Sequence, residues 1–273
     1  MSNDAPGDST DSLGVSDTPP PIAHPSGAQL VISRDLPELS RRAAELFVTL
    51  AQRAASVEGE RFTVALSGGE TPRSLYQLLA TPDYASQIPW ERVHVFWGDE
   101  RHVPPDDKDS DYRMAHESLL AHVPIPAENV HRIRAELPDA AEAAREYAAE
   151  LRGFFGLQPS ELPRFNLVLL GMGGDGHTAS LFPGTNAIHN TTDLVAAPWV
   201  EKLDTYRITL TAPVLNNAQA VVFLVAGAGK AGVLKEVLDG PRDVGRLPSQ
   251  LIAPTNGDLI WMLDDAAAKS VTL

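Results

Sequence analysis

Two residues in one glycine-rich stretch have the types and the spacing needed for acid–base chemistry. Asp175 precedes His177 by two positions in the run Gly-Met-Gly-Gly-Asp-Gly-His that begins at Gly171. A carboxylate this close can hold an imidazole ring and tune its basicity, and an imidazole can take a proton from water near neutral pH. The pattern predicts His177 as a general base with Asp175 beside it.

The same stretch also fits a second interpretation, a dinucleotide site. Gly171, Gly173 and Gly176 match the pattern Gly-x-Gly-x-x-Gly after an apolar run. A dinucleotide-binding unit needs a long helix after this pattern, whereas Pro183 and Gly184 would end any helix here after a few residues. We therefore favour proton transfer as the role of this stretch.

A hydroxyl and two glycines in a row indicate a site for phosphate. Ser67, Gly68 and Gly69 follow an apolar run and precede a helix that is expected to open at Pro72. Glycines let the backbone approach a ligand, and the free N–H groups of a helix N-terminus favour an anion. A tight turn that binds nothing is the alternative. A serine nucleophile is disfavoured, because that fold needs a late histidine and the last one here is His189.

A third group of ionisable residues follows the apolar run that ends at Trp97. Asp99 has the chemistry to orient a catalytic group or to bind a sugar hydroxyl. Arg101 has the planar fork of donors that clamps an anion. A solvated loop is an equally simple interpretation of this segment by itself.

No metal site is predicted. Asp99, Asp175 and His177 are the best candidate set, but no compact ligand spacing such as His-Glu-x-x-His accompanies them. Residues 107–111 begin like a calcium loop, yet Tyr112 stands where such a loop needs glycine. These aspartates are expected to cap the helix that follows.

Alternating strand and helix patterns surround these segments. Continuous apolar runs predict strands at residues 30–32, 62–66, 93–97, 166–170, 207–210, 220–225 and 259–263. Periodicity and end signals predict helices at residues 36–50, 72–79, 110–122, 138–155 and 229–238, with a short terminal helix capped by Asp264. We predict a single α/β domain with an open, mostly parallel sheet flanked by helices, which binds ligands beyond the carboxyl ends of its strands.

The composition of the chain limits its possible binding partners and its expected cellular location. The 273 residues include 36 Asp and Glu against 22 Lys and Arg, so the net charge of −14 disfavours nucleic acid and membrane partners. The absence of cysteine excludes disulfides and a cysteine nucleophile. Residues 1–28 are acidic and proline-rich and are predicted to be a disordered tail, with residues 29–273 as the catalytic domain. No basic targeting segment begins the chain, so we expect a cytoplasmic protein.

The chemistry-bearing segments, taken together and in this order, resemble the glucosamine-6-phosphate isomerase/6-phosphogluconolactonase family. The resemblance runs from about Leu30 to the C-terminus. Its segments are Leu-Ser-Gly-Gly-Glu-Thr-Pro from Leu66, Trp-Gly-Asp-Glu-Arg from Trp97, residues 171–184, Tyr-Arg-Ile-Thr-Leu from Tyr206, Gly229-Lys230, and Pro-Thr-Asn-Gly from Pro254 with Trp261.

The resemblance implies a fold, a reaction and a set of site residues. The implied fold is sugar-phosphate isomerase-like and Rossmann-related. The implied reaction is hydrolysis of 6-phosphogluconolactone to 6-phosphogluconate, the second step of the oxidative pentose phosphate pathway, without a cofactor. It assigns phosphate contacts to Ser67, Gly68, Gly69, Arg207 and Lys230. It assigns the role of general base to His177, with Asp99, Arg101 and Asp175 lining the lactone end. We expect a small-molecule substrate and a monomer or weak homodimer.

Two other functions stay open. A deaminase or isomerase of the same family needs a glutamate soon after its histidine, whereas here Phe182 stands before Pro183 at that place. A sugar-phosphate sensor that regulates transcription would carry a basic helix-turn-helix, whereas residues 1–28 are acidic. Lactone hydrolysis is therefore favoured over both.

Overall fold

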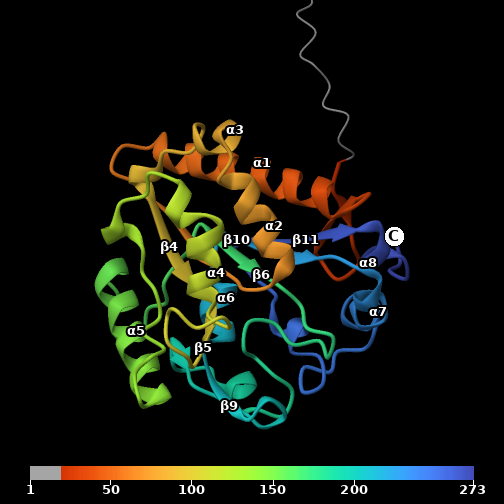
Figure 1. The fold of residues 1–273 in the computed structure, drawn as a ribbon. Coiled ribbons are helices and arrows are strands. Elements are labelled where there is room, and N and C mark those ends of the chain that lie inside the picture. Colours follow the sequence, from red (N-terminus) through yellow and green to blue (C-terminus); the bar gives the residue numbers. More distant parts are fainter. Residues whose placement is uncertain (1–19) are drawn as a thin grey trace, which may run out of the picture.

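The main sheet of the protein is parallel except at one edge. A computed structural model describes residues 20–273 (Figure 1). The strand order is β1-β2-β11-β10-β6-β3-β4, and only β1 pairs antiparallel with its neighbour. The strands are β1 (Ile22–Ala23), β2 (Gln29–Ser33), β3 (Phe62–Leu66), β4 (Val93–Trp97), β6 (Leu167–Leu170), β10 (Ala220–Val225) and β11 (Asp258–Asp264).

Helices connect these strands and cover the sheet. They are α1 (Leu36–Ala55), α2 (Glu70–Leu79), α3 (Pro82–Ala85), α4 (Asp111–Ser118), α5 (Ala140–Phe155), α6 (Ala212–Asn216), α7 (Ala231–Asp239) and α8 (Asp265–Ala268). Helices α1 and α2 pack together, and α5 lies at the far left in Figure 1. Asp35 caps α1 by accepting from the N–H of Glu38 at 2.9 Å, and Asp264 caps α8 as expected. The predicted α/β domain with a mostly parallel sheet is confirmed.

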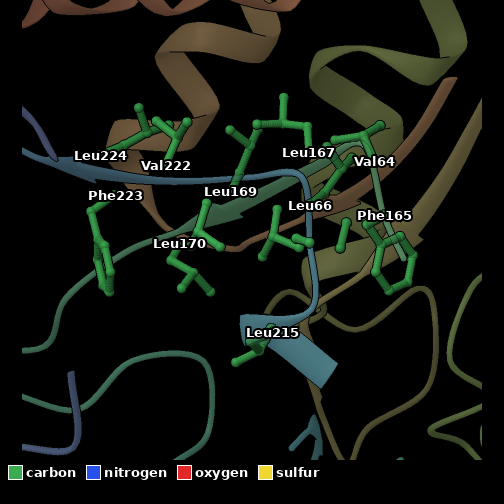
Figure 2. Close-up of a cluster of buried hydrophobic side chains, with 14 of the residues drawn as sticks. Val64, Leu66, Phe165, Leu167, Leu169, Leu170, Leu215, Val222, Phe223 and Leu224 are labelled. Atoms are coloured by element: carbon green, nitrogen blue, oxygen red, sulfur yellow. The ribbon is translucent and has the colours of Figure 1, made fainter. Parts of the chain in front are cut away.

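The central strands are buried on both faces, which explains their continuous apolar runs. All residues of β3, β6 and β10 are buried. Figure 2 shows the cluster where these strands meet, with Leu66, Leu169 and Val222 among its labelled side chains. Next to it Phe223 and Trp261 stack with their ring centroids 3.8 Å apart. This core holds the carboxyl ends of the strands in fixed positions.

A second, antiparallel sheet departs from the prediction. It contains β5 (Asp99–Arg101), β7 (Val195–Ala196), β8 (Trp199–Val200) and β9 (Thr205–Leu210). The segment after Trp97 was expected to be a loop, and residues 207–210 a strand of the main sheet. Gly98 joins the two sheets, since its N–H donates to the carbonyl of Leu66 and its carbonyl accepts from Leu210, both at 2.8 Å. Figure 1 shows β5 and β9 together below the main sheet.

Two helices have ends that differ from the predicted ones, because local backbone conformation determines where each begins or ends. Helix α2 begins at Glu70, because Gly69 has a φ of 105° and serves as its N-cap. Pro72 then lies in the first turn, where its missing N–H costs nothing. The helix expected at residues 110–122 ends at Ser118, since Leu119 leaves the helical conformation.

The first described residues belong to the folded domain. The predicted tail was residues 1–28, and its first part, residues 1–19, lies outside the described residues. Ile22 and Ala23, however, pair with β2, and the ring of His24 contacts Asp239 of α7 at 3.0 Å. Residues 22–24 therefore pack with the domain and not with the predicted tail, because a local composition bias does not reveal strand pairing with a later segment. Between residues 20 and 273 no helix is long and apolar enough to cross a membrane.

Candidate active site

A small cavity lies where the prediction placed the ligand, beyond the carboxyl ends of neighbouring strands. Its volume is about 160 Å³. It is lined by Ser67, Gly68, Asp99, Arg101, Asp111, Gly171, Met172, Gly173, His177 and Ala179. Strands β3, β4 and β6 end at Leu66, Trp97 and Leu170, directly before three of these segments. Their parallel pairing brings segments far apart in the chain to one edge of the sheet.

His177 and Asp175 form a close pair at this cavity. The Nδ1 atom of His177 lies 2.5 Å from Oδ1 of Asp175. An ionised carboxylate only accepts hydrogen bonds, so Nδ1 carries the proton and Nε2 keeps a free lone pair. The ring of Phe182 stacks on the imidazole with centroids 4.0 Å apart. Gly173 lies so close to the ring that an added Cβ there would be 2.1 Å from Nδ1. The imidazole is thus held at its edge and on its face.

Asp175 has a second cationic partner that the sequence did not suggest. The ammonium of Lys202 donates to Oδ2 of Asp175, while His177 occupies Oδ1. Burial by itself would raise the pKa of Asp175, but the hydrogen bonds from His177 and Lys202 outweigh it and hold that pKa well below its usual range. Asp175 therefore stays ionised across the physiological pH range.

Arg101 is anchored by a buried acidic pair. Its Nη1 atom lies 3.0 Å from Oδ1 of Asp111 and donates to the carbonyl of Asp109 at 2.5 Å. Burial raises the pKa of Asp111 well above its usual value, and the nearby Glu100 adds to this. Burial also raises the pKa of Glu100, whose carboxylate accepts from the N–H groups of Arg101, Asp111 and Tyr112 at 2.8 Å each. The acidic pair fixes the guanidinium at the cavity wall.

The aspartates of residues 107–111 therefore do more than cap a helix. Ser110 is the N-cap of α4 and accepts from the N–H of Arg113 at 3.1 Å. Asp111 instead faces the cavity, and its carboxylate fills the space beside Gly68. An added Cβ on Gly68 would lie 1.6 Å from Oδ1 of Asp111, so only glycine fits there.

The segment from Ser67 to Gly69 leaves hydrogen-bonding groups open beside the cavity. The Oγ atom of Ser67 is buried and has no hydrogen-bond partner among the described residues. Tyr76 fixes the backbone of Ser67, accepting from its N–H at 3.1 Å and donating to its carbonyl at 2.9 Å. No side chain caps the N-terminus of α2 after Gly69. An anion would satisfy these groups.

Asp99 is held in place by the segment that carries the imidazole. Its Oδ2 atom accepts from the hydroxyl of Ser180 at 2.7 Å. Ser180 lies in the 171–184 stretch, and its own N–H donates to Thr209 of β9 at 3.2 Å. The contact ties the β5 segment to the His177 segment across the cavity.

The two remaining predicted cations differ in their placement. Arg207 on β9 lies opposite Arg101 on β5 in the strand register. Burial and the charge of Arg101 lower the pKa of Arg207. Lys230 ends a short helical turn after β10. Neither Arg207 nor Lys230 is among the residues that line the cavity, so the predicted phosphate contacts of both stay predictions.

Sequence reasoning missed three residues of the site: Asp111, Ser180 and Lys202. Asp111 belongs to a run that looks like a helix cap, and Ser180 stands inside the glycine-rich stretch with no pattern of its own. Lys202 is separated from Asp175 by a loop and two short strands. Within residues 20–273 no group of three or more His, Asp and Glu side chains is arranged to hold a metal ion.

The sequence of the chain matches a known protein family. Residues 34–261 match the family of glucosamine-6-phosphate isomerases and 6-phosphogluconolactonases. The chain belongs to this family, and the resemblance noted from the sequence is confirmed.

Relatives that are similar over most of the chain include several 6-phosphogluconolactonases. A 6-phosphogluconolactonase of Nostoc is 42% identical over 239 residues, which is 88% of this chain and 96% of the relative. The rat 6-phosphogluconolactonase is 39% identical over 264 residues, covering 92% of this chain and 97% of the relative. The solved structure of 6-phosphogluconolactonase from Trypanosoma cruzi superposes with a TM-score of 0.80 at 28% identity, covering 90% of this chain and 97% of that chain.

Proposed function

We propose that this chain hydrolyses 6-phospho-D-glucono-1,5-lactone to 6-phospho-D-gluconate, the second step of the oxidative pentose phosphate pathway. The observation that carries the proposal is the Asp175–His177 pair facing a cavity whose other walls are Arg101 and the uncapped segment at Ser67 and Gly68. A lactone is an activated ester, so one positioned base and a few donors suffice for its hydrolysis.

The chemistry proceeds through one addition and one elimination. Nε2 of His177 takes a proton from water as the water oxygen attacks the lactone carbonyl carbon. Arg101 stabilises the oxyanion that forms, an effect worth about 2.7–4 kcal/mol for a donor of this kind. The intermediate then reforms the carbonyl, the bond to the ring oxygen breaks, and that oxygen takes up a proton as it becomes a hydroxyl. The imidazolium becomes neutral again by giving up the proton that it took from water, which balances the proton gained by the ring oxygen, and the carboxylic acid product then releases its own proton to solvent.

The phosphate would bind on the side away from the reacting carbonyl. Arg207 lies opposite Arg101 in the register and has no ion pair among the described residues. A phosphate carries a charge of about −1.5 to −2, so it would pair with the guanidinium group of Arg207. The hydroxyl of Ser67 and the N–H groups after Gly69 would complete the contact, and Lys230 would approach from the β10 edge.

The neighbourhood of the imidazole supports hydrolysis over deamination. Phe182 stacks on His177, so an apolar ring stands where the deaminase pattern has a carboxylate to assist ring opening. We further propose that the protein works in the cytoplasm as a monomer or weak homodimer, with a catalytic domain that includes β1 as well as residues 29–273.

The test is a lactonase assay with the substrate formed in situ. The purified chain should open 6-phosphogluconolactone far faster than the spontaneous reaction, measured as acid release in a pH-stat. Glucosamine 6-phosphate serves as the second substrate. Release of ammonia from it without lactone turnover would replace this proposal with the deaminase.

A further inference from the structure

Lys202 stands at the tip of a hairpin that reaches over the catalytic pair. Strand β8 pairs antiparallel with β9 through Trp199 and Tyr206, and residues 201–204 form the turn between them. Asp204 closes the turn in the left-handed conformation, with a φ of 49°. The side chain of Lys202 leaves this turn and donates to Oδ2 of Asp175. The same hairpin also carries Arg207, which lies opposite Arg101 in the strand register.

Lys202 contacts both groups that hold the imidazole. Besides its bond to Asp175, its ammonium lies 4.7 Å from the centre of the Phe182 ring. Phe182 stacks on the face of His177, and Asp175 binds its Nδ1 edge. Lys202 therefore contacts both Asp175 and Phe182, and these two side chains in turn contact the imidazole of His177.

Lys202 also affects the electrostatics around the imidazole, in addition to its structural contacts. Asp175 contacts the ring and Lys202 contacts Asp175, while Asp99 and Arg101 line the same cavity as the ring. An ionised Asp175 by itself stabilises the protonated imidazole, which is the inactive form of a general base. A cation on the second carboxylate oxygen offsets this field without breaking the bond that orients the ring.

We propose that Lys202 is a positioning residue, which holds Asp175 so that the imidazole of His177 is oriented and kept available for proton abstraction from water. The proposal rests on the proposed lactonase function. It assigns to the hairpin of β8 and β9 a part in catalysis that the sequence patterns did not indicate.

The experiment compares Lys202→Met with Lys235→Met. Lys235 is a matched control, since its side chain is 50% exposed against 51% for Lys202, and it binds Asp239 at 2.9 Å, away from the cavity. For Lys202→Met we expect kcat to fall about tenfold or more with KM within about twofold. The acid limb of kcat/KM should move to higher pH by roughly half to one unit. Lys202→Arg, which keeps the charge, should recover most of kcat, and Lys235→Met should match the wild type.

Two outcomes overturn the proposal. One is a Lys202→Met enzyme whose kcat and acid limb equal those of Lys235→Met. The other is an unchanged midpoint when the imidazole of His177 is titrated by NMR in Lys202→Met, where we expect a higher midpoint than in the wild type. The titration needs no turnover, so it tests the role of Lys202 even if the wild type fails to hydrolyse the lactone. Should Lys202→Met not fold, Lys202→Gln gives the same two readouts.

Discussion

At the scale of single residues, the proposed general base is the imidazole of His177. His177→Ala should lower kcat by about 10²–10⁴-fold, the usual contribution of a positioned general base. The fold should persist, because the ring lines a cavity at the edge of the sheet and is not part of the buried core. Circular dichroism and the pH-stat assay measure the two effects. His189→Ala is the control, since His189 is exposed and lies in a separate turn. Near-normal turnover in His177→Ala would refute the assignment of the base.

Gly68 gives a second prediction at this scale, based on space. A methyl group at Gly68 would overlap the buried carboxylate of Asp111, which in turn anchors Arg101. Gly68→Ala should therefore lower the melting temperature and weaken substrate binding together. Gly153→Ala is the matched control, because nothing lies within 4 Å of its added methyl group in the interior of α5. That control should stabilise the protein by about 0.5–1 kcal/mol. Equal melting temperatures for the two variants would show that the backbone at Gly68 or the side chain of Asp111 moves to accommodate the methyl group without loss of stability.

At the scale of elements, the β5–β9 pairing decides how the substrate is held. It places Arg207 opposite Arg101 in the register, and a phosphate bound by Arg207 would contribute binding that is the same in the ground state and the transition state. Arg207→Ala should raise KM about tenfold or more while kcat changes little. Arg145→Ala, at an exposed ion pair with Asp139 on α5, should leave both constants unchanged. A fall in kcat with unchanged KM would contradict the anchoring role.

The elements also show which parts of the structure a sequence reveals. Strands β3 and β4 have the predicted bounds, because both are mostly apolar and almost wholly buried, which leaves a local signature in the sequence. The predicted residues Ser67, Gly68, Asp99, Arg101 and His177 meet at one cavity, because parallel strands align their carboxyl ends.

What the sequence concealed depends on contacts between distant segments. The short strand β5 is made of charged residues and is stable only through its pairing with β9. The burial of Asp111 depends on Gly68 making room for it, and the contact of Lys202 depends on where a hairpin tip lands. The burial of Asp111 and the contact of Lys202 leave no periodic pattern in the sequence, so neither can be predicted from it.

At the scale of the whole molecule, stability in acid has a source outside the active site. His94 lies near the amino end of β4, opposite the end that carries the catalytic segments. Its Nδ1 atom is 3.1 Å from Nε2 of His131, and the ring of Phe154 packs on it at 4.8 Å between centroids. Burial, with added repulsion from His131 and Arg61, lowers the pKa of His94 to about 4. The folded protein therefore resists protonation of a ring that is free to protonate when the chain unfolds.

The sign of the effect follows from proton binding. Below the usual histidine pKa of about 6.5 the unfolded chain binds a proton at His94 that the folded chain refuses, so folding weakens as the pH falls from about 6.5 towards 4. His94→Gln stays neutral at every pH and should lose less stability between pH 7 and pH 5, by about 1 kcal/mol, since the ring is only partly buried. Urea unfolding at both pH values measures this difference, with His189→Gln as the exposed control. Lactone turnover at pH 7 should not change, because the site lies at the other end of the sheet. If His94→Gln and the wild type lose equal stability in acid, protonation elsewhere governs the acid sensitivity of the fold.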